Sequence, residues 1–112
     1  MADNLLTLSA QLSEIQPLRK TPAGIAVIHC QLAHVSSQTE AEIVREVRLE
    51  LQAIAIGELA QIIAVATPGC QIHASGFLAA KSHRSHTPVF HLNHIEFIEG
   101  NEHGPKNKIQ EK

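Results

Sequence analysis

Apolar and polar residues alternate at every second position through most of this chain, and this pattern constrains the fold more than any other feature. In residues 6–13 the even positions are apolar and the odd positions are polar. Successive side chains of a strand point to opposite sides of a sheet, so this period of two predicts a strand with one buried face. Similar runs predict four more strands, over residues 25–35, 43–56, 71–81 and 89–98.

One segment, between the third and fourth predicted strands, departs from the period of two. After Gly57, four apolar residues have the spacing of one helix face: Leu59, Ile62, Ile63 and Ala66. This spacing predicts a helix of about three turns. Pro68 and Gly69 follow it, and both are typical of a helix end. The polar residues 36–42 contain neither glycine nor proline, and we expect them to form a long, mobile turn.

Two irregularities are expected in the last two strands. Gly76 lies inside the fourth strand, where a glycine indicates a bend or a close approach of another backbone. In the fifth strand the alternation changes phase between Leu92 and Ile95. A bulge near Asn93 or His94 would produce this change.

Three strands, a helix and two strands are the elements of the OB-fold, a five-stranded barrel. The predicted fold class is therefore all-β with one short helix, closed as an OB-fold barrel. A length of 112 residues suits a single domain. We assign the domain to residues 1–100 and treat the polar residues 101–112 as a disordered tail.

Positive charge is concentrated in two predicted loops. The net charge of the whole chain is −2, so any attraction to nucleic acid must be local. Arg19 and Lys20 lie in the loop between the first and second strands. The loop between the fourth and fifth strands contains Lys81, His83, Arg84 and His86. OB-folds bind oligonucleotides with these two loops, which predicts a site for the phosphates of a single strand, with histidines that add positive charge at low pH.

The third strand carries Arg45 and Arg48 between the two loops. A guanidinium can bind a phosphate or stack on a base, but Arg48 can instead pair with Glu46 and Glu50 on the strand surface. Phe77 lies opposite the apolar face of the fourth strand. It is a candidate for base stacking, for contact with a dimer partner, or for a satellite of the core.

Other classes of function find little support in the sequence. Cys70 and His73, like His83 and His86, have a spacing that metal ligands can use, but no paired zinc motif is present, so we expect no metal or cofactor. No serine-nucleophile motif or phosphate-binding loop indicates an enzyme. No apolar run approaches the roughly 20 residues of a membrane span, and no secretory signal is recognisable. A cytoplasmic location with free Cys30 and Cys70 thiols is expected.

Several short motifs follow one another in the order of a known family. They are Pro-Leu-Arg-Lys at 17–20, Pro-Ala-Gly-Ile at 22–25, His-Cys-Gln at 29–31, His34, Gly69, Gly-Phe-Leu at 76–78, His91, Ile95 and Glu96. Over residues 4–99 the chain resembles bacterial primosomal replication protein N, the PriB family. It is similar also to the single-stranded DNA-binding proteins.

The resemblance implies an OB-fold homodimer that associates through its first strands and binds single-stranded DNA. It further implies a place in the bacterial replication-restart primosome, beside a helicase and other primosome proteins. Basic residues of the loop between the fourth and fifth strands contact DNA in this family, and Lys81 and Arg84 occupy that loop here. The first-loop lysine of the family corresponds to Lys20 or its neighbour Arg19.

The chain also departs from the family pattern. Arg48 and Ile43 stand where family members can carry aromatic residues, and Val35 stands where a basic residue can occur. His83 and His86 stand where lysines are expected. These departures leave open a protein–protein adaptor with weak DNA binding, favoured by the net negative charge and the three aromatic residues, all phenylalanine. An RNA-binding module is a second alternative, and a metalloenzyme is a remote third.

Overall fold

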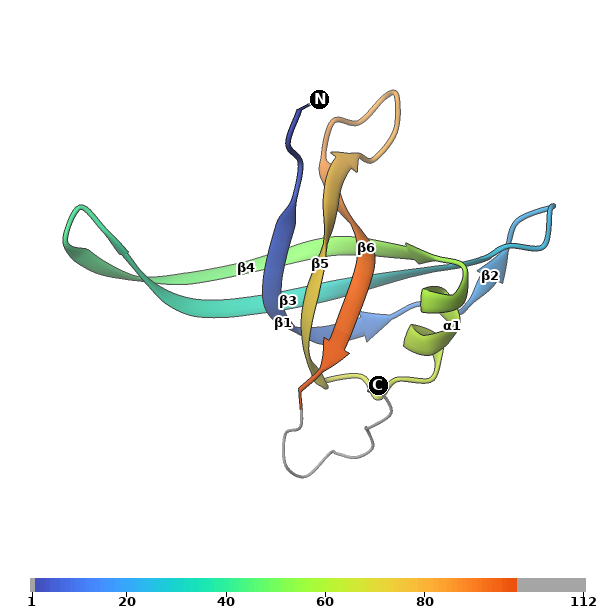
Figure 1. The fold of residues 1–112 in the computed structure, drawn as a ribbon, viewed down its shortest axis with the longest axis horizontal. Helices are drawn as coiled ribbons and strands as arrows, with labels where there is room; N and C mark the ends of the chain where they lie inside the picture. The colour runs from blue at the N-terminus through green and yellow to red at the C-terminus, as the bar shows by residue number, and fades with distance from the viewer. Residues whose placement is uncertain (1, 99–112) are drawn as a thin grey trace.

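The computed structural model describes residues 2–98. The strands are β1 (Leu6–Ile15), β2 (Arg19–Lys20), β3 (Ala26–Glu40), β4 (Ile43–Ile56), β5 (Gln71–Ala80) and β6 (Pro88–Phe97), and the helix is α1 (Glu58–Ala64). The sheet order is β1-β5-β6-β4-β3-β2, and an additional pairing of β1 with β3 closes the five long strands into a barrel (Figure 1). The predicted OB-fold is thus confirmed. The predicted tail, 101–112, lies outside the described residues.

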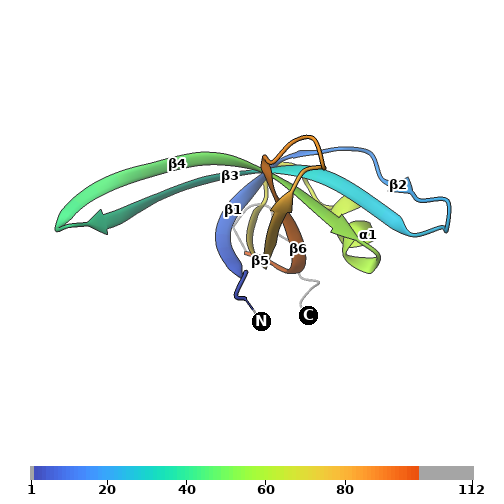
Figure 2. The same ribbon diagram turned by 90° about the horizontal axis from the view of Figure 1, so that it is seen from above.

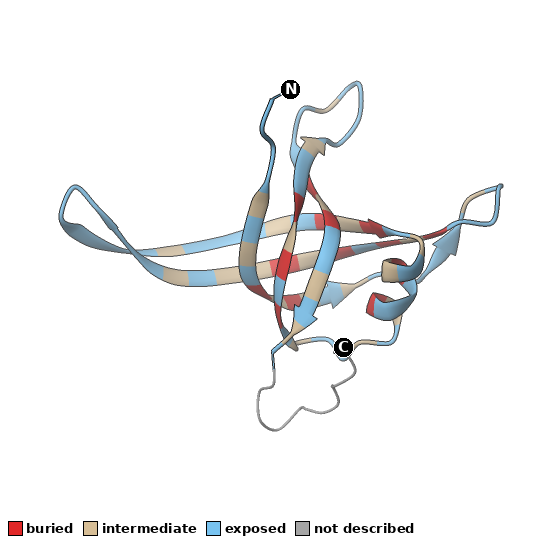
Figure 3. Ribbon diagram, viewed as in Figure 1, coloured by how far each residue is buried: buried red, intermediate tan, exposed pale blue. Residues whose placement is uncertain are grey.

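The core lies inside the barrel and is entirely apolar among residues 2–98 (Figure 3). Its largest fully buried side chains are Phe90, Leu12, Ile28, Leu32, Ile63 and Ile72. Six buried alanines complete the core, Ala60 on α1 and the others on the strands: Ala10, Ala26, Ala53, Ala55, Ala60 and Ala74. Buried residues alternate with exposed ones along the barrel parts of the strands, as the period of two predicted.

β3 and β4 continue beyond the barrel as a two-stranded arm, residues 34–49 (Figures 1 and 2). They pair residue by residue from Val27 with Ile56 to Glu40 with Ile43. The turn consists of Ala41 and Glu42, whose φ angles are 52° and 68°. Two consecutive positive φ values are typical of the tight type I′ hairpin. The predicted long, mobile turn over 36–42 is therefore wrong, because an uninterrupted ladder extends β3 to Glu40.

The bulge expected in the last strand is confirmed. Ser75 pairs with His94 and Gly76 pairs with Leu92, which leaves Asn93 outside the register. The close approach expected at Gly76 is confirmed as well, because a Cβ atom there would lie 1.9 Å from the main-chain oxygen of His91.

Helix α1 is shorter than predicted. It has seven residues and buries Ala60 and Ile63 against the barrel. After Ala64 the chain tightens, since the amide nitrogens of Val65 and Ala66 bond the carbonyl oxygens three residues earlier. Ala66, expected on the helix face, lies in this following turn. No helix within residues 2–98 is long and apolar enough to cross a membrane.

Candidate nucleic-acid interface

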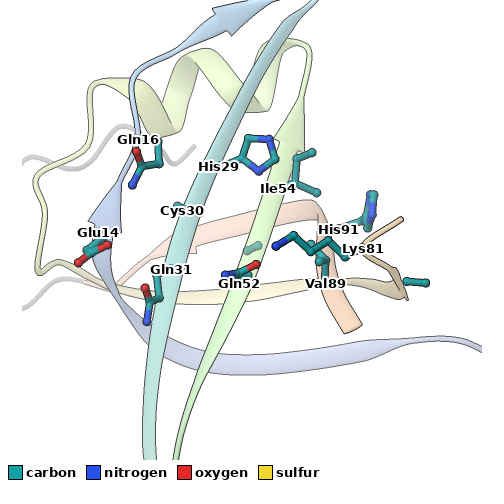
Figure 4. Close-up of a pocket in the computed structure, with 12 residues that line it drawn as sticks. Glu14, Gln16, His29, Cys30, Gln31, Gln52, Ile54, Lys81, Val89 and His91 are labelled. Atoms are coloured by element: carbon teal, nitrogen blue, oxygen red, sulfur yellow. The ribbon is translucent and has the colours of Figure 1, made fainter. Parts of the chain in front are cut away.

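A groove with a volume of about 360 Å³ crosses the outer face of the barrel. Figure 4 shows Glu14 and Gln16 along one side, and Lys81, Val89 and His91 along the other. The middle is formed by side chains of β3 and β4. The lining residues are Glu14, Gln16, His29, Cys30, Gln31, Gln52, Ala53, Ile54, Ala80, Lys81, Val89 and His91. OB-folds bind nucleic acid on this face, formed by the strands here named β3 and β4 and by the two flanking loops.

Side chains of four neighbouring strands form a row across this face. His29 of β3 lies opposite Ile54 of β4, and Ile54 lies opposite His91 of β6. His91 in turn lies opposite Phe77 of β5. We call His29, Ile54, His91 and Phe77 the cross-strand row. The register of the barrel therefore places three flat rings and one branched aliphatic side chain in line.

Both ends of the cross-strand row carry a further contact. The rings of Phe77 and His91 are stacked, with centroids 4.9 Å apart and planes 9° from parallel. Phe77 is 37% exposed, so it lies outside the core and the core alternative for it is wrong. At the other end, Arg19 Nη2 donates to His29 Nε2 at 3.2 Å. Arg19, predicted to be in a loop, thus reaches the groove from the short strand β2.

Lys20 points to the opposite side of β2 from Arg19. On β2, Arg19 pairs with Val27, and Lys20 pairs with the buried Ala26. Because neighbouring side chains of a strand point to opposite faces, Lys20 is directed away from the face that carries His29. The structure therefore joins Arg19 to the groove and separates Lys20 from it.

Lys81 lines the groove at the start of a compact loop, residues 81–87. The Lys81 amide donates to the Thr87 carbonyl at 2.8 Å, and the hydroxyl of Ser82 accepts from the Arg84 amide at 3.2 Å. His83, Arg84 and His86 are exposed in this loop and do not line the groove. Hydrogen bonds within the loop hold its backbone. The side chains of His83, Arg84 and His86 are therefore exposed at the surface of the loop, where they can contact a ligand.

Arg45 and Arg48 lie on the arm, apart from the groove. Arg45 pairs with Glu40 at 2.7 Å and Arg48 pairs with Glu46 at 2.8 Å. The pairing of Arg48 with Glu46 is the alternative that the sequence had raised. Both pairs are well exposed, where an ion pair contributes at most about 1 kcal/mol. A phosphate can therefore replace either glutamate at small cost.

The sequence-based analysis missed His29, Ile54, Gln52 and His91 as groove residues. His29 and His91 had been noted only among the motifs of the family resemblance, because their proximity comes from pairing between strands far apart in the chain. The one signal available was the alternation itself, which places His29 opposite the apolar face of its strand. Among residues 2–98 no three His, Cys, Asp or Glu side chains gather closely enough to hold a metal ion.

Comparison with known proteins shows the family to which this chain belongs. A family model described as another single-strand binding protein family matches residues 4–94. The replication restart protein PriB of Neisseria meningitidis serogroup C (strain 053442) is 37% identical over 98 residues, which are 88% of this chain and 97% of that protein. This chain belongs to the PriB family. The PriB of Nitrosomonas europaea is 34% identical over 95 residues, 85% of this chain and 88% of that protein.

The fold of this chain is similar to solved structures of PriB and of a single-stranded DNA binding protein. PriB from Ralstonia solanacearum aligns with a TM-score of 0.77 at 34% identity, over 87% of this chain and all of that chain (100%). The wild-type single-stranded DNA binding protein from Thermus aquaticus aligns with a TM-score of 0.71 at 23% identity, over 88% of this chain and 51% of that chain. The second similarity shows a shared fold. The resemblance to the PriB family read from the sequence is confirmed.

Cys30 belongs to the core and also forms part of the groove lining, with 5% of the residue exposed. Burial raises its pKa from 9.0 to about 11. The folded state therefore favours the protonated thiol, and the stability from this preference is present below pH 9 and is lost as pH rises through about 11. A shift of this size corresponds to about 3 kcal/mol.

We expect the free energy of unfolding to fall more steeply between pH 9 and about 11 in the wild type than in Cys30→Ala. Urea unfolding followed by circular dichroism across this range measures both slopes. The slope, not the absolute stability, is compared, because the alanine also leaves a small cavity. Equal slopes for the two proteins would show that the Cys30 thiol does not titrate differently on folding.

Proposed function

We propose that this member of the PriB family binds single-stranded DNA as a non-enzymatic accessory factor of bacterial replication restart. The observation that carries the proposal is that His29, Ile54 and His91 of the cross-strand row line a groove together with Lys81. Arg19 adjoins this groove through its hydrogen bond to His29. Single-strand binding uses a positive path for phosphates and flat side chains for bases. The printed names of the matched relatives, replication restart protein PriB, support the biological setting.

The proposed binding is electrostatic and tolerant of sequence. Lys81 and Arg19 hold phosphates at opposite edges of the groove, and Arg84 extends the path along the loop surface. His83 and His86 lie exposed on the same loop beside Arg84 and form part of the proposed contact surface. Lys20, Arg45 and Arg48 contact the strand farther from the groove, the two arginines by exchanging a glutamate for a phosphate.

The proposed partners are single-stranded DNA, the restart helicase with other primosome proteins, and a second copy of this chain in the bacterial cytoplasm. An open strand edge supports the dimer. Residues 6–10 of β1 pair with β5 on one side. On the other side strand pairing with β3 begins at Gln11, and the Ser9 carbonyl already accepts a hydrogen bond from His34 Nδ1 at 2.6 Å, so residues 6–8 are the free part of the edge. A second β1 can therefore add to this free edge. We assign these activities to the domain at 1–100.

A second candidate function is the adaptor with weak DNA binding. The observation that favours it is the arm, where both arginines are paired with glutamates. The arm also exposes apolar side chains, among them Val35, Ile43 and Val44. In this alternative the chain stimulates a helicase by direct contact, and loss of the groove cations leaves that stimulation intact.

Fluorescence anisotropy with a labelled single strand of about 36 nucleotides tests the proposal, since this length holds at least two of the larger OB-fold sites of about 16 nucleotides. We expect binding that weakens as salt rises and that is stronger for the single strand than for a duplex of the same length. An RNA strand of equal length tests the RNA-binding alternative. Absence of binding at low salt would reject the proposal in favour of the adaptor.

A further inference from the structure

Each imidazole of the cross-strand row is held by a second planar group. His91 is stacked on Phe77 with a centroid distance of 4.9 Å. The Nε2 atom of His29 accepts a hydrogen bond from Arg19 at 3.2 Å, which leaves the hydrogen of that ring on Nδ1. One face of the His91 ring is therefore covered by Phe77 and one edge of the His29 ring is held by Arg19, and both histidines line the same groove.

The space between the two imidazoles suits one flat ring. His29 and His91 belong to strands on either side of β4, with Ile54 between them in the register. Two strand spacings place their backbones about 9.5 Å apart. A ring stacked between two others needs contact distances of about 3.5 Å on each face. The groove volume, about 360 Å³, lies near the lower end of the range for small-ligand sites.

We propose that His29 and His91 form a slot for a single nucleobase of the bound strand, with Ile54 as its floor. The inference rests on the proposed function and assigns a base contact to a site otherwise described by its charges. A nucleobase has two flat faces for the imidazoles and a polar edge that the Gln52 amide can bond. Its phosphate lies at the rim, where Lys81 lines the groove.

The charges of the groove argue against a free anion as the ligand. Lys81 is the one Lys or Arg among the groove-lining residues within 2–98, and Glu14 lines the same groove. A ligand with a flat uncharged part and a single adjacent phosphate fits this arrangement better than inorganic phosphate does.

Tryptophan fluorescence reports on the slot directly, because the chain contains no tryptophan. His91→Trp places an indole at the slot wall and retains a stacking surface. We expect an oligothymidylate to quench its fluorescence in a saturable manner, and an abasic oligomer of the same length to leave it unchanged. The matched control is His94→Trp, on the same strand beyond the bulge and outside the groove, whose fluorescence should not respond.

Affinity measurements separate this inference from the proposed function. We expect the wild type to bind oligothymidylate about tenfold more tightly than the abasic strand, and His91→Ala to remove that difference while leaving the abasic affinity unchanged. Equal wild-type binding of both strands, or no quenching in His91→Trp, would overturn the slot and leave phosphate binding standing. An equal loss for both strands in His91→Ala would likewise overturn it. No wild-type binding of either strand would overturn both.

Discussion

Replacing Gly76 with alanine is expected to destabilise the barrel by about 3 kcal/mol, enough to lower Tm by about 15 °C in a domain of this size. The added Cβ would lie 1.9 Å from the main-chain oxygen of His91 and 3.1 Å from the amide nitrogen of Asn93. Both contacts are backbone atoms, so no side chain can rotate away to relieve them. The β5–β6 ladder would have to separate at the bulge.

Thermal and urea unfolding followed by circular dichroism measure this loss. Ser75→Ala is the matched control, because Ser75 is the adjacent residue of β5 and its change removes a hydroxyl without adding an atom near β6. We expect the control to stay within about 1 kcal/mol of the wild type. A Gly76→Ala protein as stable as the control would contradict the close approach of β5 and β6.

The same substitution should disturb the groove. Gly76 precedes Phe77, and His91 supplies the oxygen that the new Cβ would strike. The bulge thus lies directly beside the stacked pair of Phe77 and His91 and sets the register in which they meet. A bulge that positions functional side chains is a recurrent use of this irregularity.

The double variant Lys81→Ala, Arg84→Ala is expected to bind single-stranded DNA about 25-fold more weakly at 0.1 M salt. Each lost phosphate contact lowers the slope of log affinity against log salt by about 0.7, so two lost contacts lower it by about 1.4. Over the tenfold range of salt between 1 M and 0.1 M, this difference in slope amounts to about 25-fold. The loss should be the same for strands of different sequence, because phosphate contacts carry no base information. Anisotropy titrations at several salt concentrations measure the affinity and the slope together.

A charge-matched control distinguishes position from net charge. Lys20→Ala with Arg45→Ala removes the same two positive charges, but Lys20 points away from the groove face and Arg45 is paired with Glu40. We expect a several-fold smaller loss for this pair. Equal losses in the two double variants would mean that the overall charge, and not the loop beside the groove, governs binding.

Much of the barrel could be predicted from local sequence signals. The period of two located all five long strands, and the change of phase after Leu92 located the bulge at Asn93. Each of these signals is contained within one strand. The glycine at 76 likewise marked a close approach before any partner strand was known.

The arm and the helix length could not be predicted in the same way. Residues 36–40 are mostly polar because the arm has solvent on both faces, so no buried side marks them as a strand. Ala41 and Glu42 adopt positive φ angles. Tight hairpin turns of this kind are usually recognised in a sequence by glycine or asparagine, and neither residue is present at these two positions. Ala66 matched the apolar spacing of α1 but lies in the turn that follows it.

The candidate site was predicted in part. Local charge identified Lys81, which lines the groove, and Arg19, which is bonded to His29. His29 and His91 became visible as groove residues only through the register of β3, β4 and β6. Pairings between distant segments depend on how the barrel closes, which no single segment determines. This is why the basic loops could be named from the sequence and the cross-strand row could not.

Photo-crosslinking tests most directly the central claim, that a single strand of DNA lies across the groove face. An oligonucleotide containing 5-iododeoxyuridine is bound to the full-length chain, irradiated and mapped by mass spectrometry of the digested protein. The account predicts crosslinks to Phe77, His91 and the loop at 81–87. Crosslinks confined to the arm at 34–49, with the groove peptides unmodified, would contradict it.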